Sequence, residues 1–208
     1  MIKLGSLFDG SGGFPLAGTL HGIVPVWASE IEPYPMRVTA LRFPNMKQLG
    51  DVTKINGAEI EPVNIISFGS PCQDLSVAGL QKGIHKGERS NLFFEAIRII
   101  KEMRNATANV YPRFGVWENV PGAFSSNKGE DFRAVPVQKS DKPPRRYIVR
   151  RLTPLECCRL QGFPDWWEDG ADGSDSARYK MWGNGIALPC AADVLGRIAE
   201  EMRKEAGT

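Results

Sequence analysis

The sequence predicts an α/β fold in which a mostly parallel β-sheet is flanked by helices. Short apolar runs alternate along the chain with segments whose apolar residues recur at helical spacing. Acidic residues and a cysteine follow these apolar runs. Parallel strands gather their ligand-binding residues at their carboxyl ends, so this placement also favours a parallel sheet with right-handed crossovers.

The alternating pattern occupies the first 122 residues. Strands are expected over residues 2–8, 23–29, a short segment around Leu49, 63–68 and 114–117. Helices are expected over residues 14–20, 35–43 and 91–103. Pro35 would lie in the first turn of the second helix, where a missing backbone N–H is tolerated.

A different pattern follows. Residues 125–144 are polar, include three prolines and predict no strand. Thr153 with Glu156 three residues later predicts a capping box at the start of a helix. The expected regular segments are helices over residues 153–160 and 186–202, with a loop over 169–176 between them.

Composition is that of an ordinary globular chain. Of 208 residues, 42% are hydrophobic and 24% charged, enough for one domain with a sizeable core or one domain plus a small appendage. The net charge of +2 does not by itself indicate a nucleic-acid-binding protein. Residues 142–151 hold five cations and no acid, which fits a solvated turn or a phosphate-contacting edge; composition alone favours the solvated turn.

Neither a secretory segment nor a membrane span is indicated, so the expected location is the cytoplasm, with reduced thiols. The cysteines are Cys72, Cys157, Cys158 and Cys190, and they form no C-x-x-C pair. With only two histidines in the chain, no metal site is expected. The adjacent Cys157 and Cys158 lie in an amphipathic helical pattern, typical of small core or surface residues.

The turn after the first predicted strand is glycine-rich, Phe-Asp-Gly-Ser-Gly-Gly over residues 8–13. Glycines let the backbone approach a ligand closely, although such a turn can also be purely structural. Its spacing differs from dinucleotide and P-loop motifs. Glu30 and Asp51 end the next two strands, where they are either solvated acids or acceptors for ribose hydroxyls and an exocyclic amine. Together these features favour a nucleoside-bearing cofactor without a pyrophosphate.

Cys72 follows a Gly-Ser-Pro turn at the end of the 63–68 strand. Most cysteines are inert core residues, but backbone N–H groups near a turn lower a thiol's pKa, so Cys72 is a candidate nucleophile. His85 is the only histidine nearby, which argues against a Cys–His hydrolase. Glu118 ends the 114–117 strand and is either a solvated turn acid or, with a raised pKa, a proton donor beside the thiolate.

These motifs occur in an order that resembles the family of DNA (cytosine-5)-methyltransferases of the restriction–modification type. The motifs are Phe-Asp-Gly-Ser-Gly-Gly (8–13), Ser-Glu (29–30), Gly-Asp-Val (50–52), Gly-Ser-Pro-Cys-Gln (69–73), Glu-Asn-Val (118–120), Arg-Leu-Thr-Pro-Leu-Glu (151–156), Arg-Leu-Gln-Gly-Phe-Pro (159–164) and Gly-Asn (183–184). They span nearly the whole chain, and the order of Pro-Cys-Gln and Glu-Asn-Val is highly specific.

The resemblance implies a Rossmann-like S-adenosylmethionine-dependent methyltransferase fold, S-adenosylhomocysteine as a product, and double-stranded DNA with a flipped cytosine as substrate. It implies a bacterial or phage-encoded enzyme. Cys72 would attack C6 of the cytosine, and Glu118 would hydrogen-bond or protonate N3. Residues 75–89 resemble a mobile loop that closes over DNA. The cofactor residues implied are Phe8, Gly10, Gly12, Glu30, Ile31, Asp51, Val52, Pro71 and Asn184.

The chain departs from the family's pattern between residues 123 and 150, where a Gln-x-Arg-x-Arg strand motif and a target-recognition region are expected and not found. We therefore expect a cofactor-binding and catalytic core (1–122), a shortened linker (123–150), a segment completing the core (151–208) and an exposed sheet edge. An engineered deletion, a naturally reduced member and a gene remnant would each explain this; intact flanking motifs favour the first.

Three functions follow from these expectations. The first is C5 methylation of cytosine in DNA through a covalent cysteine–C6 intermediate. The second is a catalytically impaired cofactor-binding core that no longer recognises DNA. The third is a related tRNA methyltransferase, which would be expected to differ around residues 71–73.

Overall fold

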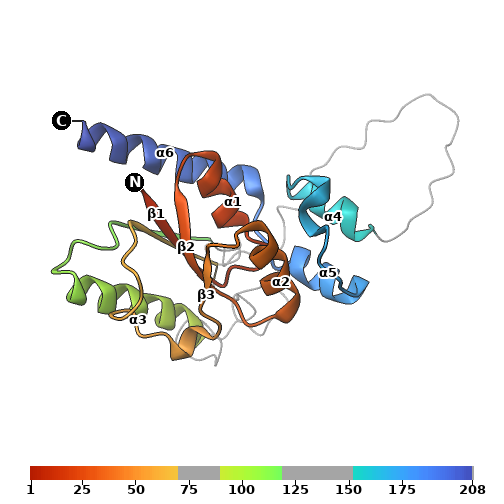
Figure 1. Ribbon diagram of the computed structural model, residues 1–208, viewed down its shortest axis with the longest axis horizontal. Helices are drawn as coiled ribbons and strands as arrows, with labels where there is room; N and C mark the ends of the chain where they lie inside the picture. Colours follow the sequence, from red (N-terminus) through yellow and green to blue (C-terminus); the bar gives the residue numbers. More distant parts are fainter. Residues whose placement is uncertain (70–89, 119–151, 208) are drawn as a thin grey trace, which may run out of the picture.

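The computed structural model describes residues 1–69, 90–118 and 152–207, and these form a five-stranded parallel sheet flanked by helices (Figure 1). The strands are β1 (Lys3–Leu7), β2 (Val24–Ser29), β3 (Lys47–Gln48), β4 (Ile65–Phe68) and β5 (Phe114–Trp117). Their spatial order is β3-β2-β1-β4-β5, and every pairing is parallel. The α/β fold class and each predicted strand are confirmed.

Strand register brings the carboxyl ends of the central strands level with one another. The last residue of β1, Leu7, pairs with Ser29 of β2 and with Phe68 of β4. Phe68 in turn pairs with Trp117 of β5. The residues that directly follow these strands therefore meet along a single edge of the sheet.

Helices cover both faces of the sheet. One face carries α3 (Ser90–Ala106), and the other carries α1 (Gly13–Leu20) and α6 (Leu188–Ala206), which pack against each other (Figure 1). Two clusters of buried residues match this layering: one contains Ala96, Ile99 and Met103 of α3 with strand residues, the other Phe14 of α1 and Leu195 of α6. A further helix, α2 (Pro33–Arg42), follows β2 in the chain.

The C-terminal segment begins with α4 (Pro154–Leu160), whose capping box is present as predicted. Thr153 Oγ1 accepts a hydrogen bond from the Glu156 backbone N–H, and the Glu156 carboxylate accepts one from the Thr153 N–H. The 3₁₀ helix η3 (Asp165–Glu168) follows and buries Trp167 in the core beside α1. Buried residues of this segment thus share a cluster with Leu4 of β1 and Phe14 of α1.

One α-helix of the described residues, α5 (Asp175–Gly183), was not predicted. The expected loop over 169–176 ends at Ser174, whose hydroxyl accepts a hydrogen bond from the Ala177 N–H and caps α5. Three of the four residues before α5, Ala171, Gly173 and Ser174, are small, and no clear amphipathic period follows them. The helix is held instead by its contacts with α2 and α4.

Several expectations concern residues outside the described part of the chain. They include Pro71, Cys72, the 75–89 loop and the 123–150 linker. Within the described ranges, β5 is an edge strand, and no helix is long and apolar enough to cross a membrane. The same ranges contain no cluster of three or more side chains that could hold a metal ion.

Candidate functional site

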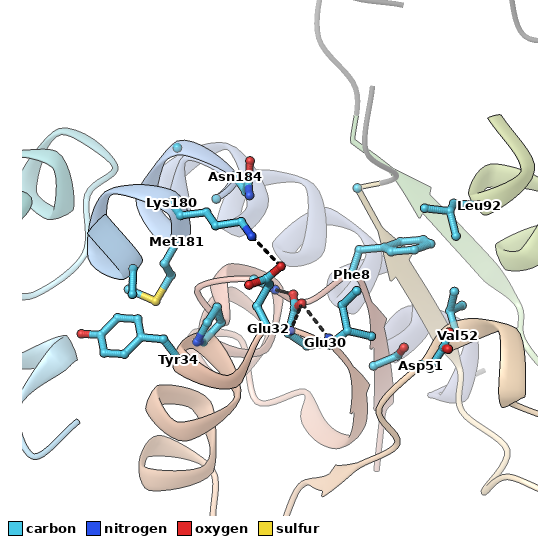
Figure 2. A pocket seen from close by; sticks show the side chains of 18 of the residues that line it. Phe8, Glu30, Glu32, Tyr34, Asp51, Val52, Leu92, Lys180, Met181 and Asn184 are labelled. Carbon is cyan, nitrogen blue, oxygen red and sulfur yellow. Dashed lines mark hydrogen bonds and ion pairs between the residues drawn. The ribbon is translucent and has the colours of Figure 1, made fainter. Parts of the chain in front are cut away.

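A cavity of about 740 Å³ lies at the carboxyl edge of the sheet, walled on the far side by α5 (Figure 2). Its volume falls in the range of about 300–1,000 Å³ that small-molecule sites occupy. The predicted site residues that line it are Phe8, Gly10, Glu30, Ile31, Asp51, Val52, Glu118 and Asn184. Residues scattered over the sequence are thus brought to one place by the sheet register.

The glycine-rich turn carries the chain from β1 into α1. Phe8 and Gly10 adopt left-handed backbone conformations, with φ of 56° and 53°, and both line the cavity. Gly12 does not line it; a Cβ there would come within 2.8 Å of a methyl carbon of Thr39. Gly12 is therefore required for packing α1 against α2, and its contact with a cofactor stays a prediction.

The carboxylate of Glu30 is held by three backbone N–H groups. Its Oε2 accepts from Gly10 at 2.8 Å, and its Oε1 accepts from Ile31 at 2.7 Å and Glu32 at 2.9 Å. This side chain therefore ties the turn after β1 to the turn after β2. Its orientation toward the centre of the cavity is fixed before any ligand binds.

Asp51 stands at the apolar end of the cavity, with Phe8, Val52 and Leu92 (Figure 2). Its Oδ1 accepts hydrogen bonds from the Thr53 backbone N–H at 2.9 Å and from the Thr53 hydroxyl at 2.8 Å. These hydrogen bonds hold the pKa of Asp51 below its usual range. Asp51 is an ionised acceptor beside apolar surface, which suits an aromatic base that carries an amine.

Glu118 lies where β5 ends. Its backbone N–H donates to the Phe68 carbonyl at 3.0 Å and so continues the pairing of β5 with β4. Partial burial raises the pKa of Glu118. A Cβ on Gly69 would stand 2.9 Å from Glu118 Oε2, so the carboxylate rests directly over this glycine. Cys72 lies three residues after Gly69 in sequence.

The wall formed by α5 includes residues that the sequence did not single out. Lys180 Nζ lies 2.6 Å from Glu32 Oε1, and both residues line the cavity (Figure 2). Tyr34 of α2 also lines this end. Because α5 was not predicted, nothing in the sequence placed Lys180 beside the Glu30 turn.

Glu168 holds this wall in position. Its buried carboxylate accepts hydrogen bonds from Tyr34 Oη at 2.6 Å, Arg178 Nε at 2.9 Å and Trp182 Nε1 at 2.9 Å. Burial opposes ionisation, but these hydrogen bonds outweigh it and hold the pKa of Glu168 below its usual range. Glu168 thereby joins η3, α2 and α5.

Asp9 is an acid near the site whose carboxylate lacks hydrogen-bond partners among the described residues. Its side chain is buried. Burial raises the pKa of Asp9 to about 7; the nearby Ser6 hydroxyl opposes this rise, and the negative charge of Glu30 adds to it. The sequence indicated only that this acid lies at a strand end.

Comparison with known proteins shows which family this sequence resembles. The family model for C-5 cytosine-specific DNA methylases matches residues 2–139 and 133–200. A DNA N-6-adenine-methyltransferase of Escherichia phage P1 is 37% identical over 128 residues, covering 59% of this chain and 17% of that protein. The type II methyltransferase M.HhaI of Haemophilus parahaemolyticus is 34% identical over 134 residues, covering 64% and 38%.

The chain therefore spans well under half the length of these curated relatives. Among solved structures, the Dnmt2 methyltransferase of S. pombe matches with a TM-score of 0.60 and 13% identity, over 97% of this chain and 99% of that chain. At this identity the match supports the methyltransferase fold and nothing finer.

Proposed function

Because the chain belongs to the family of C-5 cytosine-specific DNA methylases, we propose that it transfers a methyl group from S-adenosylmethionine to C5 of a cytosine in DNA. The observation that carries the proposal is the position of Glu118. An acid of raised pKa, suited to a pyrimidine nitrogen, lines the same cavity as the acids suited to an adenosine. One cavity then holds a methyl donor and an acceptor base together.

The lining fits the cofactor that the family uses. The apolar end with the Asp51 carboxylate suits an adenine and its amine, and Glu30 suits ribose hydroxyls. Among the described lining residues there are four acids, Glu30, Glu32, Asp51 and Glu118, against one cation, Lys180. This negative balance favours a ligand with a positive sulfonium over its neutral thioether product.

When bound, the cofactor supplies an electrophilic methyl group. The Cys72 thiolate would add to C6 of the cytosine, and a hydrogen bond or proton from Glu118 to N3 would stabilise the charge that moves into the ring. C5 thereby becomes nucleophilic and accepts the methyl group. Transfer of the C5 proton to solvent then expels Cys72 as a thiolate, N3 returns its proton to Glu118, and the aromatic ring is restored.

A DNA duplex containing 5-fluorocytosine tests this sequence of steps. Fluorine cannot leave C5 as a proton would, so the cysteine–C6 bond should persist and give an adduct that survives denaturing electrophoresis. We expect an adduct with the native chain and cofactor, none with Cys72→Ser, and formation at least about 100-fold slower with Glu118→Gln. Cys190, exposed on α6, provides the control: Cys190→Ser should react as the native chain does.

The alternative function, a cofactor-binding core that does not recognise DNA, is favoured by one observation: the chain spans only a small part of its curated relatives. A cofactor-binding core without DNA recognition would bind S-adenosylhomocysteine in calorimetry and form no adduct on any DNA. That result would overturn the methylation proposal and leave the binding function. Mass spectrometry of treated unmodified DNA adds a further check, since N6-methyladenine in place of 5-methylcytosine would contradict the proposed target atom.

A further inference from the structure

Lys180 has no explanation in the chemistry above. It extends from α5 into the cavity at the end away from Phe8 and Leu92 (Figure 2). Its ion pair with Glu32 adds little stability, because the two side chains are 58% and 39% exposed and solvent screens such pairs. A cation kept among acids, at one end of an open cavity, is better explained by a ligand that brings a negative group there.

The backbone places Lys180 beside the predicted cofactor residues. The Asn184 N–H donates to the Lys180 carbonyl at 3.2 Å, so Asn184, the C-cap of α5, lies one helical turn after Lys180. Glu32, the partner of Lys180, donates its backbone N–H to Glu30 at 2.9 Å. The cavity therefore offers apolar surface, then the Glu30 carboxylate, then an ammonium group.

We propose that Lys180 binds the carboxylate of the cofactor's amino-acid part and releases Glu32 when it does so. The order of groups in an adenosyl amino acid, which is base, ribose and then amino acid, matches the order of features along the cavity. An ammonium–carboxylate hydrogen bond is charge-assisted and stronger than a neutral one. This assignment rests on the proposed function, because it takes the cavity to be the cofactor site.

Two ligands that differ in one group test the assignment. S-adenosyl-3-thiopropylamine is S-adenosylhomocysteine without its carboxylate. Titration calorimetry on the full chain gives a dissociation constant for each, and their ratio isolates the carboxylate. We expect the native chain to favour S-adenosylhomocysteine about five- to tenfold, and Lys180→Met to abolish this preference while binding the amine about as well as the native chain does.

The Glu32→Gln variant distinguishes recognition of the carboxylate by Lys180 from a purely structural role of the Lys180–Glu32 ion pair. If Lys180 recognises the carboxylate, removal of its competitor Glu32 keeps or increases the preference. If the ion pair only fastens α5 to the Glu30 turn, Glu32→Gln and Lys180→Met behave alike, and the assignment is wrong. An unchanged ratio in Lys180→Met also overturns it.

Lys3→Met is the matched control, since Lys3 forms a similar ion pair with Glu61 at 2.7 Å and does not line the cavity. It should keep the native ratio; loss of the preference there as well would overturn the assignment to Lys180. A native chain that binds neither ligand would overturn the proposed cofactor site itself. If the native chain binds both ligands and the ratio of their dissociation constants is the same in Lys180→Met, only this inference is overturned.

Discussion

At the residue scale, two acids near the cavity are tuned in opposite directions. Asp51 accepts two hydrogen bonds from Thr53, which stabilise its ionised form, whereas Asp9 is buried without a partner among the described residues. Hydrogen bonding lowers a carboxyl pKa and desolvation raises it. The first acid is thus suited to accepting hydrogen bonds, and the second is a source of pH-dependent instability.

We predict that Asp9 makes the fold less stable as the pH rises. Its folded pKa of about 7 exceeds the ordinary value of 3.8, so the folded state holds the proton more tightly. The contribution is fully present below pH 3.8 and is lost as pH rises through 7. The Asp9→Asn side chain cannot ionise. The difference in free energy of unfolding between this variant and the native chain should therefore shift in favour of the variant by roughly 2–3 kcal/mol between pH 5 and pH 8.

Urea unfolding at several pH values measures this difference. Asp193→Asn, at an exposed site on α6, is the control and should track the native chain at each pH. Curves that stay parallel for Asp9→Asn and the native chain would mean that Asp9 finds a hydrogen-bond donor and remains ionised.

At the element scale, α5 is positioned by side chains rather than by its own sequence. Glu168 links it through Arg178 and Trp182 to η3, and through Tyr34 to α2. All three donors converge on the carboxylate of Glu168, a residue with 9% of its surface exposed. Loss of such an acceptor leaves buried donors unsatisfied, so the cost exceeds that of a single hydrogen bond.

We therefore expect Glu168→Ala to lower the free energy of unfolding by about 3–5 kcal/mol, because Tyr34, Trp182 and the partly buried Arg178 all lose the same acceptor. Tyr34→Phe is the matched variant; it removes a single donor and should cost about 1 kcal/mol. Chemical denaturation of both variants supplies the comparison. If Glu168→Ala were no worse than Tyr34→Phe, α5 would have to be held by its apolar contacts alone.

The same scale explains which elements could be predicted from the sequence. The strands, α1, α3, α4 and α6 carry local signals: apolar runs, helical periodicity, or the Thr153–Glu156 capping box. In contrast, α5 has weak periodicity, and its position depends on Glu168, a residue far from α2 in sequence. The acids at the strand ends were enough to predict one wall of the cavity from the sequence. The wall that contains Lys180 could be recognised only in the tertiary structure.

At the scale of the whole molecule, the two ends of the chain share one core. Leu4 of β1 and Phe14 of α1 belong to the same buried cluster as Trp182 of α5 and Leu195 of α6. The cavity is likewise divided between strand ends from the N-terminal half and α5 from the C-terminal half. The predicted 1–122 core and 151–208 segment should therefore unfold together rather than as separate units.

Leu195→Ala tests this coupling from the side remote from the cavity. The side chain is fully buried, so the substitution should lower the free energy of unfolding by about 2–5 kcal/mol. If the chain is a single cooperative unit, three signals should be lost at the same urea concentration: tryptophan fluorescence, helical circular dichroism and binding of S-adenosylhomocysteine. The substitution should shift the midpoint of all three by the same amount. Val194→Ala, with 42% of its surface exposed on the same helix, is the control and should shift the midpoint little. If ligand binding survived after the helical signal of α6 had melted, the N-terminal residues would form an independent unit and α5 would not be needed to close the site.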